Sequence, residues 1–291
     1  MRDEDSKFAN QIPNLSDVTL CAVDTVNPDL AARALDITLS QCQFADAMLI
    51  THATVPTRAR IVPIEPIASL AAYSHFMLKR LADHIATPWV LVVQWDGFVT
   101  DASQWRRDFL QYDYIGARWP NADTGKDIGN GGFSLRSAKL LKTLASDRFV
   151  IESDVGEDVL IGSTWRSALE TDFGIRFAPA GIADQFAYEY ALPRQPTFGF
   201  HGVFNMWRHV EDRAMFEIID ALDIQTLASP RGVALLKNYC DLRKFNCVRA
   251  MYRRYREYLS VADVAHAFVH NGLSDEAARN YVTLCEASLA N

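Results

Sequence analysis

The stretch Pro88-Trp-Val-Leu-Val-Val-Gln-Trp-Asp-Gly97 carries the clearest strand signal in the sequence. Its first residues form an unbroken apolar run, rich in β-branched side chains, which is typical of a strand buried on both faces of a sheet. The run ends on a single carboxylate, Asp96, and an ionised carboxylate is costly in a buried strand unless it is paired or bound to a metal. We therefore expect Asp96 at the carboxyl end of the strand, the edge at which open α/β sheets bind ligands.

Strand-like and helix-like segments alternate on both sides of this run. Upstream, the patterns predict strands at 18–23 and 47–50, a helix at 28–41, a proline-broken edge strand at 61–64 and a long helix at 67–85. Downstream, they predict a helix at 102–110, strands at 114–117 and 131–135, and a helix at 138–145. Repeated β–α units of this kind indicate a Rossmann-like α/β fold, with a mostly parallel sheet flanked by helices.

The character of the sequence changes near residue 208. Residues 210–291 contain several helix signals and no convincing strand pattern: Ser260 to Asp263 has the form of a capping box, and Asn271-Gly272 is a helix stop. We expect three parts, namely a polar N-terminal tail (1–16), the α/β domain (17–208) and an all-helical C-terminal appendix (209–291).

Composition excludes several classes of protein. The 291 residues are 49% hydrophobic and 22% charged, and the formal net charge of −7 argues against a nucleic-acid binder. The N-terminus lacks the apolar segment of a signal peptide, and no apolar run approaches the ~20 residues that span a bilayer. The five cysteines form no C-x-x-C pair and are typical of reduced thiols. A cytoplasmic location is therefore predicted.

Residues Arg249–Tyr258 predict a basic amphipathic helix, for which two interpretations stay open. The favoured one is a helix that packs on its neighbour and exposes its charges to solvent. The other is peripheral contact with an anionic membrane at its inner face, or with a lipid-linked acceptor.

Three further motifs carry candidate chemistry. Gly129-Asn-Gly-Gly-Phe133 has three glycines in four residues, which fits either a tight turn or close approach of the backbone to a ligand, but not a dinucleotide fingerprint. Glu157 and Asp158 precede an apolar helical stretch, so they are either a helix cap or a source of a general base. In Phe198-Gly-Phe-His-Gly202 the flanking glycines favour a functional role for His201.

In chain order these pieces resemble a poorly characterised group of glycosyltransferase-like proteins with the GT-A fold. The resemblance covers roughly residues 17–208, and its most specific element is Gly-Asn-Gly-Gly-Phe-Ser-Leu-Arg at 129–136. More distantly, the layout is similar to that of the β-1,4-galactosyltransferases. The segments that carry it are Gln94–Phe98, Tyr112–Trp119, Gly129–Ser137, Glu157-Asp158 and Phe198–Gly202.

The resemblance implies transfer of a sugar from a nucleotide donor by a hexosyltransferase-type enzyme. In such enzymes a strand-end aspartate and a late histidine hold Mn²⁺ or Mg²⁺ on the donor diphosphate, which implies Asp96 and His201 as metal ligands here. One acid of the Glu157–Asp158 pair would be the catalytic base, and Asp158 is favoured. The chain departs from the family's Asp-x-Asp pattern at Gln94, a neutral side chain that can still form hydrogen bonds.

The remaining candidate residues fall into two groups. Those expected to bind the donor end the first strand, lie on the helix before Asp96 or adjoin Asp96 itself: Asp24, Thr25, Tyr73, Lys79, Gln94, Trp95 and Asp96. Those expected to bind the acceptor are Arg118, Trp119, Gly131 and Gly132, together with the loop 121–130.

The sequence therefore predicts a metal-dependent, inverting glycosyltransferase. It would use a nucleotide-sugar donor, with a UDP-sugar as the expectation, and a glycan or glycolipid acceptor, as in bacterial polysaccharide or glycoconjugate synthesis. One alternative is a non-catalytic module that binds a nucleotide-sugar or a glycan. The other is a nucleotidyltransferase, which usually needs a glycine-rich basic loop that Asp24–Pro28 does not offer.

Overall fold

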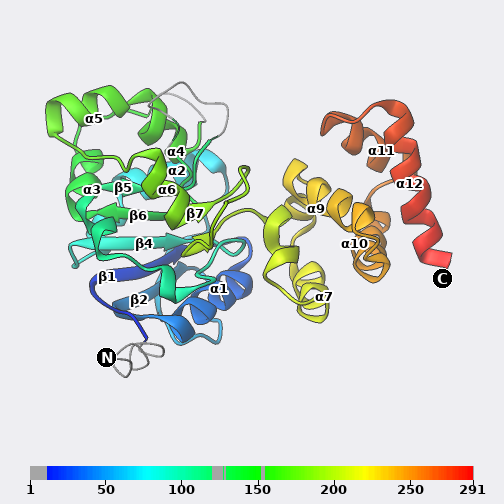
Figure 1. Ribbon diagram of the computed structural model, residues 1–291, viewed down its shortest axis with the longest axis horizontal. Coiled ribbons are helices and arrows are strands. Elements are labelled where there is room, and N and C mark those ends of the chain that lie inside the picture. Colours follow the sequence, from blue (N-terminus) through cyan, green and yellow to red (C-terminus); the bar gives the residue numbers. More distant parts are fainter. Residues whose placement is uncertain (1–11, 120–126, 128, 152–154, 291) are drawn as a thin grey trace, which may run out of the picture. The chain divides into compact units, whose positions relative to one another are not determined.

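The computed structural model describes residues 12–119, 127, 129–151 and 155–290 (Figure 1). The chain divides into two compact units, residues 1–201 and 202–291. The short 3₁₀ segment η5 (Val203–Arg208) opens the second unit, whereas the sequence patterns assign it to the first domain. Most of the predicted N-terminal tail lies outside the described residues.

The first unit contains a six-stranded sheet in the order β3-β2-β1-β4-β6-β5. The strands β1 (Asn14–Val23), β2 (Gln43–Thr51), β3 (Arg60–Pro63) and β4 (Trp89–Val93) are parallel. The last two, β5 (Tyr114–Ile115) and β6 (Phe133–Ser137), are antiparallel to each other, and β6 is antiparallel to β4. The mostly parallel sheet is thus confirmed, with β3 at an edge as its proline predicts.

Helices cover both faces of this sheet. The first three helical segments are α1 (Pro28–Gln41), α2 (Leu70–Lys79) and η1 (Leu81–His84). Val93 of β4 belongs to the same apolar cluster as Leu35 of α1, whereas its neighbour Val92 belongs to the cluster that contains Met77 of α2. Alternate residues of β4 therefore point to opposite, helix-covered faces, which explains why the strand is apolar throughout.

Several predicted elements differ from the structure. The strands β1 and β2 begin four residues earlier than expected, and β5 ends at Ile115 rather than at 117. The helix expected at 67–85 is shorter and changes at Arg80 into the turn η1. The helix expected at 102–110 is two 3₁₀ turns, η2 (Ala102–Gln104) and η3 (Arg107–Gln111), because Trp105 between them is extended and its ring packs on Phe109 and Phe198. The strand expected at 131–135 begins at Phe133, so the two glycines before it form a loop.

A second, two-stranded sheet brings distant residues together. The intervening helical segments are α3 (Ala138–Ala145), α4 (Glu157–Val159), the π-helical η4 (Leu160–Thr164), α5 (Arg166–Phe173) and α6 (Ala180–Phe186). The strands β7 (Ala187–Tyr188) and β8 (Gly199–Phe200) then pair in parallel. Because parallel strands end at the same edge, Glu189 and His201, which follow them, become neighbours.

The second unit is helical throughout its described residues, as predicted. Its helices are α7 (Asp212–Ala221), α8 (Ile224–Leu227), α9 (Pro230–Asp241), α10 (Phe245–Tyr258), α11 (Val261–His270) and α12 (Asp275–Ala290). The capping box between Ser260 and Asp263 is present, and Gly272 follows the end of α11 with a φ of 92°. Among the described helices, none has both the length and the apolar character that crossing a membrane requires.

Arginine side chains of the basic helix α10 form hydrogen bonds with backbone carbonyls of the same unit. Arg249 donates a hydrogen bond to the carbonyl of Ser288, Arg254 to that of Leu222 and Arg256 to that of Leu259. These contacts support the packing interpretation of the helix. Peripheral membrane contact stays a prediction.

Candidate functional site

His201 lies between two carboxylates, Asp96 and Glu189. Its Nε2 is 3.3 Å from Oδ1 of Asp96, and its Nδ1 is 3.0 Å from Oε1 of Glu189. All three residues are buried, with exposed fractions of 2%, 4% and 1%. Burial lowers the pKa of His201, but the charge of Asp96 and the hydrogen bonds to both carboxylates outweigh it and raise the pKa to about 10. The ring therefore carries a positive charge in this arrangement.

A tight turn at the end of β4 presents Asp96 to the histidine. The amide of Gly97 donates to the carbonyl of Gln94 at 3.0 Å, which closes the turn around Asp96. The chain then runs antiparallel to β8, where Val99 pairs with Gly199. A Cβ at position 97 would lie only 2.9 Å from the carbonyl oxygen of Phe200, so glycine allows the close approach of these two segments.

Gln94 takes part in the same cluster. Its Oε1 is 3.1 Å from Nε2 of His201, while its Nε2 donates to the hydroxyl of Tyr73 at 3.0 Å. Burial and the charge of Glu157 raise the pKa of Tyr73, so its hydroxyl stays protonated. The structure thus brings the predicted donor residues Tyr73, Gln94 and Asp96 to one place. Trp95, between them in sequence, packs against the main apolar core instead.

The glycines of the 129–133 motif separate two groups of functional side chains. A Cβ on Gly131 would lie 2.5 Å from Oε1 of Glu157 and 3.0 Å from Cβ of Asp158. A Cβ on Gly132 would lie 2.1 Å from Nε2 of His201. The two adjacent glycines therefore contact the acidic pair on one side and the histidine on the other. The backbone approaches these side chains closely, and its approach to a ligand stays a prediction.

Glu157 and Asp158 have different surroundings. Glu157 is buried and its Oε1 accepts a hydrogen bond of 2.9 Å from Nη2 of Arg136, a fully buried side chain on β6. Asp158 is partly exposed, and burial together with the charge of Glu157 raises its pKa to about 6. A carboxylate with a pKa near neutrality suits a general base, whereas one in a buried ion pair suits a structural role.

The strand-end residues Asp24 and Thr25 organise the loop after β1. Oδ1 of Asp24 accepts hydrogen bonds from the amides of Val26 and Asn27, at 2.8 and 2.7 Å. The hydroxyl of Thr25 accepts from the amide of Ile67 at 2.9 Å. Asp24 adds to the upward pKa shift of Tyr73, so its charge acts on the cluster around Gln94.

Lys79 has a structural role. Its Nζ donates to the carbonyl oxygens of Leu144, Ser146 and Phe149 at 2.7, 2.8 and 2.5 Å, all of them at or after the end of α3. These three bonds use every donor of an ammonium group. We therefore leave Lys79 out of the proposed donor site.

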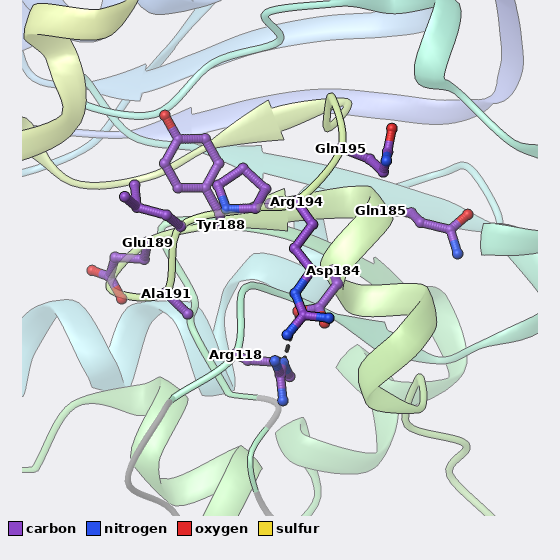
Figure 2. Close-up of a pocket in the computed structure, with 11 residues that line it drawn as sticks. Arg118, Asp184, Gln185, Tyr188, Glu189, Ala191, Arg194 and Gln195 are labelled. Carbon is purple, nitrogen blue, oxygen red and sulfur yellow. Dashed lines mark hydrogen bonds and ion pairs between the residues drawn. The ribbon is translucent and has the colours of Figure 1, made fainter.

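The predicted acceptor residues Arg118 and Trp119 flank a different region. The ring of Trp119 covers Gly129, where a Cβ would lie 2.1 Å from it. Arg118 donates to Asp184 at 2.7 Å and lines a pocket of about 370 Å³ that also includes Glu189 (Figure 2). The other lining residues are Asp184, Gln185, Ala187, Tyr188, Ala191, Leu192, Pro193, Arg194 and Gln195. Of the predicted acceptor loop 121–130, residues 121–126 and 128 lie outside the described residues.

Sequence reasoning missed three residues of the site, namely Glu189, Arg136 and Asn130. Asn130 donates from Nδ2 to Oε2 of Glu189 at 3.0 Å, and its Oδ1 accepts from the amide of Phe133. All three residues give only a weak signal in the sequence. Glu189 and Arg136 are single charges within apolar segments, and Asn130 interrupts the run of glycines. A buried charge demands a partner, but the sequence does not say which one.

The residues around Nε2 of His201 fit a divalent cation. Asp96 Oδ1 and Gln94 Oε1 lie 3.3 and 3.1 Å from this nitrogen, close to the separation of about 3 Å expected for adjacent ligands of one ion. A cation there would take the place of the proton on Nε2. Among the described residues, no group of three or more His, Cys, Asp and Glu side chains is arranged so that it could hold a metal ion. Such an ion would therefore keep waters or bind phosphate oxygens, as Mg²⁺ does in nucleotide sites.

Comparison with known proteins found one family model and distantly similar solved structures. Residues 57–201, which include the cluster around His201, match the model of a family described as "Protein of unknown function (DUF5672)". No curated protein matches the chain. One similar solved structure is the apo form of the glycosyltransferase GlyE of Streptococcus pneumoniae TIGR4, with 11% identity and a TM-score of 0.39. The match covers 68% of this chain and 55% of that one.

Proposed function

We propose that the chain is a metal-dependent glycosyltransferase that moves a sugar from a nucleoside diphosphate to an acceptor hydroxyl. The observation that carries this proposal is the position of Gly131 and Gly132. These adjacent residues contact Asp158 on one side and His201 on the other. The proposed base and the proposed diphosphate-binding group therefore lie on the two sides of one glycine pair, an arrangement that suits a single displacement.

Each proposed role follows from the chemistry of the side chain. Asp96, His201 and Gln94 would hold Mn²⁺ or Mg²⁺, which supplies positive charge that stabilises the diphosphate leaving group. Asp158, ionised above a pH of about 6, accepts the proton of the acceptor hydroxyl. The hydroxyl oxygen then forms a bond to the anomeric carbon while the bond from that carbon to the phosphate oxygen breaks, and the diphosphate leaves with the electron pair. Attack from the opposite face inverts the anomeric centre.

The donor and the acceptor are proposed to bind in two different regions of the first unit. Asp24, Thr25 and Tyr73 lie near the carboxyl ends of parallel strands, where nucleotides bind in open α/β sheets, and a UDP-sugar is the donor we propose. The pocket beside Glu189 combines the Arg118–Asp184 pair with apolar side chains, which suits one sugar of a glycan or glycolipid acceptor. A cytoplasmic role in polysaccharide or glycoconjugate synthesis is consistent with these substrates.

A non-catalytic nucleotide-sugar or glycan-binding module is the second candidate. The neutral Gln94, at the position where the family pattern has an acid, favours it. The raised pKa of Asp158 favours the enzyme. A carboxylate that only caps a helix has its pKa lowered, because the helix dipole stabilises negative charge at the N-terminus.

The test is a screen of the purified chain with UDP-glucose, UDP-galactose, UDP-N-acetylglucosamine and GDP-mannose, with Mn²⁺ or with EDTA. Release of the nucleoside diphosphate is measured, with and without mixed oligosaccharide acceptors. If the chain is a glycosyltransferase, release of the nucleoside diphosphate should require Mn²⁺ and should be lost in Asp158→Asn. Tight binding of a nucleotide-sugar without release, unaffected by Asp158→Asn, would favour the binding module.

A further inference from the structure

We infer that Glu189 is a positioning residue that fixes the orientation of His201 and thereby sets the affinity of the Asp96–His201 pair for a divalent cation. This inference rests on the proposed function, because it concerns the metal site assigned there. Glu189 does not face the proposed cation itself: it contacts Nδ1, the ring nitrogen opposite the one near Asp96.

The hydrogen bond defines which nitrogen is available to a metal. A carboxylate only accepts hydrogen bonds, so Oε1 of Glu189, 3.0 Å from Nδ1 of His201, favours a proton on that nitrogen. Nδ2 of Asn130 also lies 2.9 Å from Nδ1 and donates to Oε2 of Glu189, so the ring nitrogen, the carboxylate and the amide form one cluster. When Nε2 then gives up its proton to a cation, its lone pair points to the space shared with Asp96 and Gln94. Without Glu189 the proton can move to Nε2, which removes the ligand. Metal-binding histidines commonly have such a carboxylate behind them.

Glu189 is itself held rigidly. Its second oxygen, Oε2, accepts a hydrogen bond of 3.0 Å from Nδ2 of Asn130. Asn130 is fixed in turn by the amide of Phe133, which donates to its Oδ1, and by the hydroxyl of Tyr114, which donates to its backbone carbonyl at 3.0 Å. The buried network thus connects the glycine motif to His201, and each member limits the rotation of the next.

A purely structural role for Glu189 makes a different prediction. A buried carboxylate that only fastened β7 to β8 would lower stability when replaced, with no specific effect on the metal. A positioning residue changes the increase in melting temperature that a saturating metal produces, because that increase depends on affinity for the folded state.

The experiment measures Mn²⁺ binding to the full chain by isothermal titration calorimetry, and the melting temperature with and without Mn²⁺. In Glu189→Gln the amide has one acceptor oxygen, so it can satisfy Nδ1 of His201 or Nδ2 of Asn130 but not both. We expect Mn²⁺ affinity to fall roughly 10–100-fold and the Mn²⁺-induced rise in melting temperature to shrink.

Two further variants complete the design. The double variant Asn130→Asp with Glu189→Gln reverses the donor and the acceptor between these residues, and should recover most of the affinity. Glu170→Gln makes the same chemical change in a partly exposed ion pair with Arg166, and should bind Mn²⁺ like the wild type. Should Glu189→Gln not fold, Glu189→Asp takes its place, because its shortened carboxylate also draws Nδ1 away from its position.

The possible failures are distinct. A wild-type chain that binds no Mn²⁺ at all would overturn the metal-dependent function and this inference together. The inference alone would be overturned if the wild type binds Mn²⁺ and a folded Glu189→Gln or Glu189→Asp binds it with equal affinity. Loss of stability without a change in Mn²⁺ affinity would assign Glu189 a structural role.

Discussion

Gly132 lies directly against the imidazole of His201, so closely that a Cβ on Gly132 would fall 2.1 Å from Nε2. Because Nε2 is the atom that faces Asp96 and Gln94, the absence of a side chain at position 132 is a requirement of the site. The glycine motif and the histidine lie far apart in sequence, yet the position of His201 leaves room only for glycine at position 132.

Gly132→Ala should therefore displace His201 and abolish Mn²⁺-dependent binding of the donor. The histidine is buried among fixed neighbours, so it cannot move aside without breaking a hydrogen bond. Fluorescence titration with UDP in Mn²⁺ checks this. Gly181→Ala is the matched control, because an added Cβ there has no heavy atom within 4 Å, and it should bind as the wild type. Normal binding by a folded Gly132→Ala would disprove the proposed position of the site.

Asp96→Asn should weaken Mn²⁺ and the donor together. The change keeps the shape of the side chain but removes the charge that a hard cation needs. Calorimetric titrations with Mn²⁺ and then with UDP check it, with EDTA-treated wild type in parallel. Asp172→Asn, on the exposed side of α5, serves as the control. If Asp96→Asn and EDTA both left UDP affinity unchanged, donor binding would not depend on a metal.

Asp158→Asn should lower turnover by ~10²–10⁴-fold with nearly unchanged donor affinity, because the proposed base meets the acceptor and not the diphosphate. Glu157→Gln should act mainly through stability, since it leaves the buried guanidinium of Arg136 without its charged partner. Steady-state kinetics and urea unfolding separate the two effects. The opposite pattern, with Glu157→Gln inactive but stable and Asp158→Asn active, would exchange the two roles.

The pH profile of kcat/KM should rise with pH and level off above about 6, because Asp158 must be ionised to act as the base. The measurement is the initial rate at low substrate from pH 4.5 to 8.5, with Mn²⁺ present. Asp158→Asn should retain no such acidic limb in its residual rate. A profile without change between pH 5 and 7 would contradict this role.

The same carboxyl group should affect stability with a defined sign. Its folded pKa is raised above the usual value, so the folded state holds the proton more tightly than the unfolded chain does. Stability contributed by this group therefore falls as pH rises from about 4 to about 6, by at most about 3 kcal/mol. Above that range Asp158→Asn should be more stable than the wild type in urea unfolding, and the difference should disappear near pH 4.

Lys79→Met should destabilise the fold without affecting the donor. Three carbonyl oxygens lose a charged hydrogen-bond donor, and hydrogen bonds to charged groups contribute about 1.5–3 kcal/mol. We expect a lower free energy of unfolding in urea and a dissociation constant for UDP within twofold of the wild type. Lys142→Met on the exposed side of α3 provides the control. A large loss of UDP affinity in a stable Lys79→Met would return Lys79 to the donor site.

Elements with local signals could be predicted from the amino-acid sequence. The apolar run before Asp96 predicted a strand buried on both faces, and the capping box at Ser260 predicted a helix start, because each depends on residues within one strand or one turn. The same holds for Asp96, Asp158 and His201, which stand out against their immediate neighbours. These signals predicted a mostly parallel α/β sheet and a helical C-terminal part.

Which of these residues contact one another depends on the folded chain and could not be predicted from local patterns. The antiparallel direction of β6 and the parallel pairing of β7 with β8 depend on contacts between segments far apart in the chain. That pairing makes Glu189 the neighbour of His201, and the same folding turns Lys79 towards the end of α3. The pKa of Asp158 likewise depends on burial and on a neighbouring charge, both of which exist only after the chain has folded.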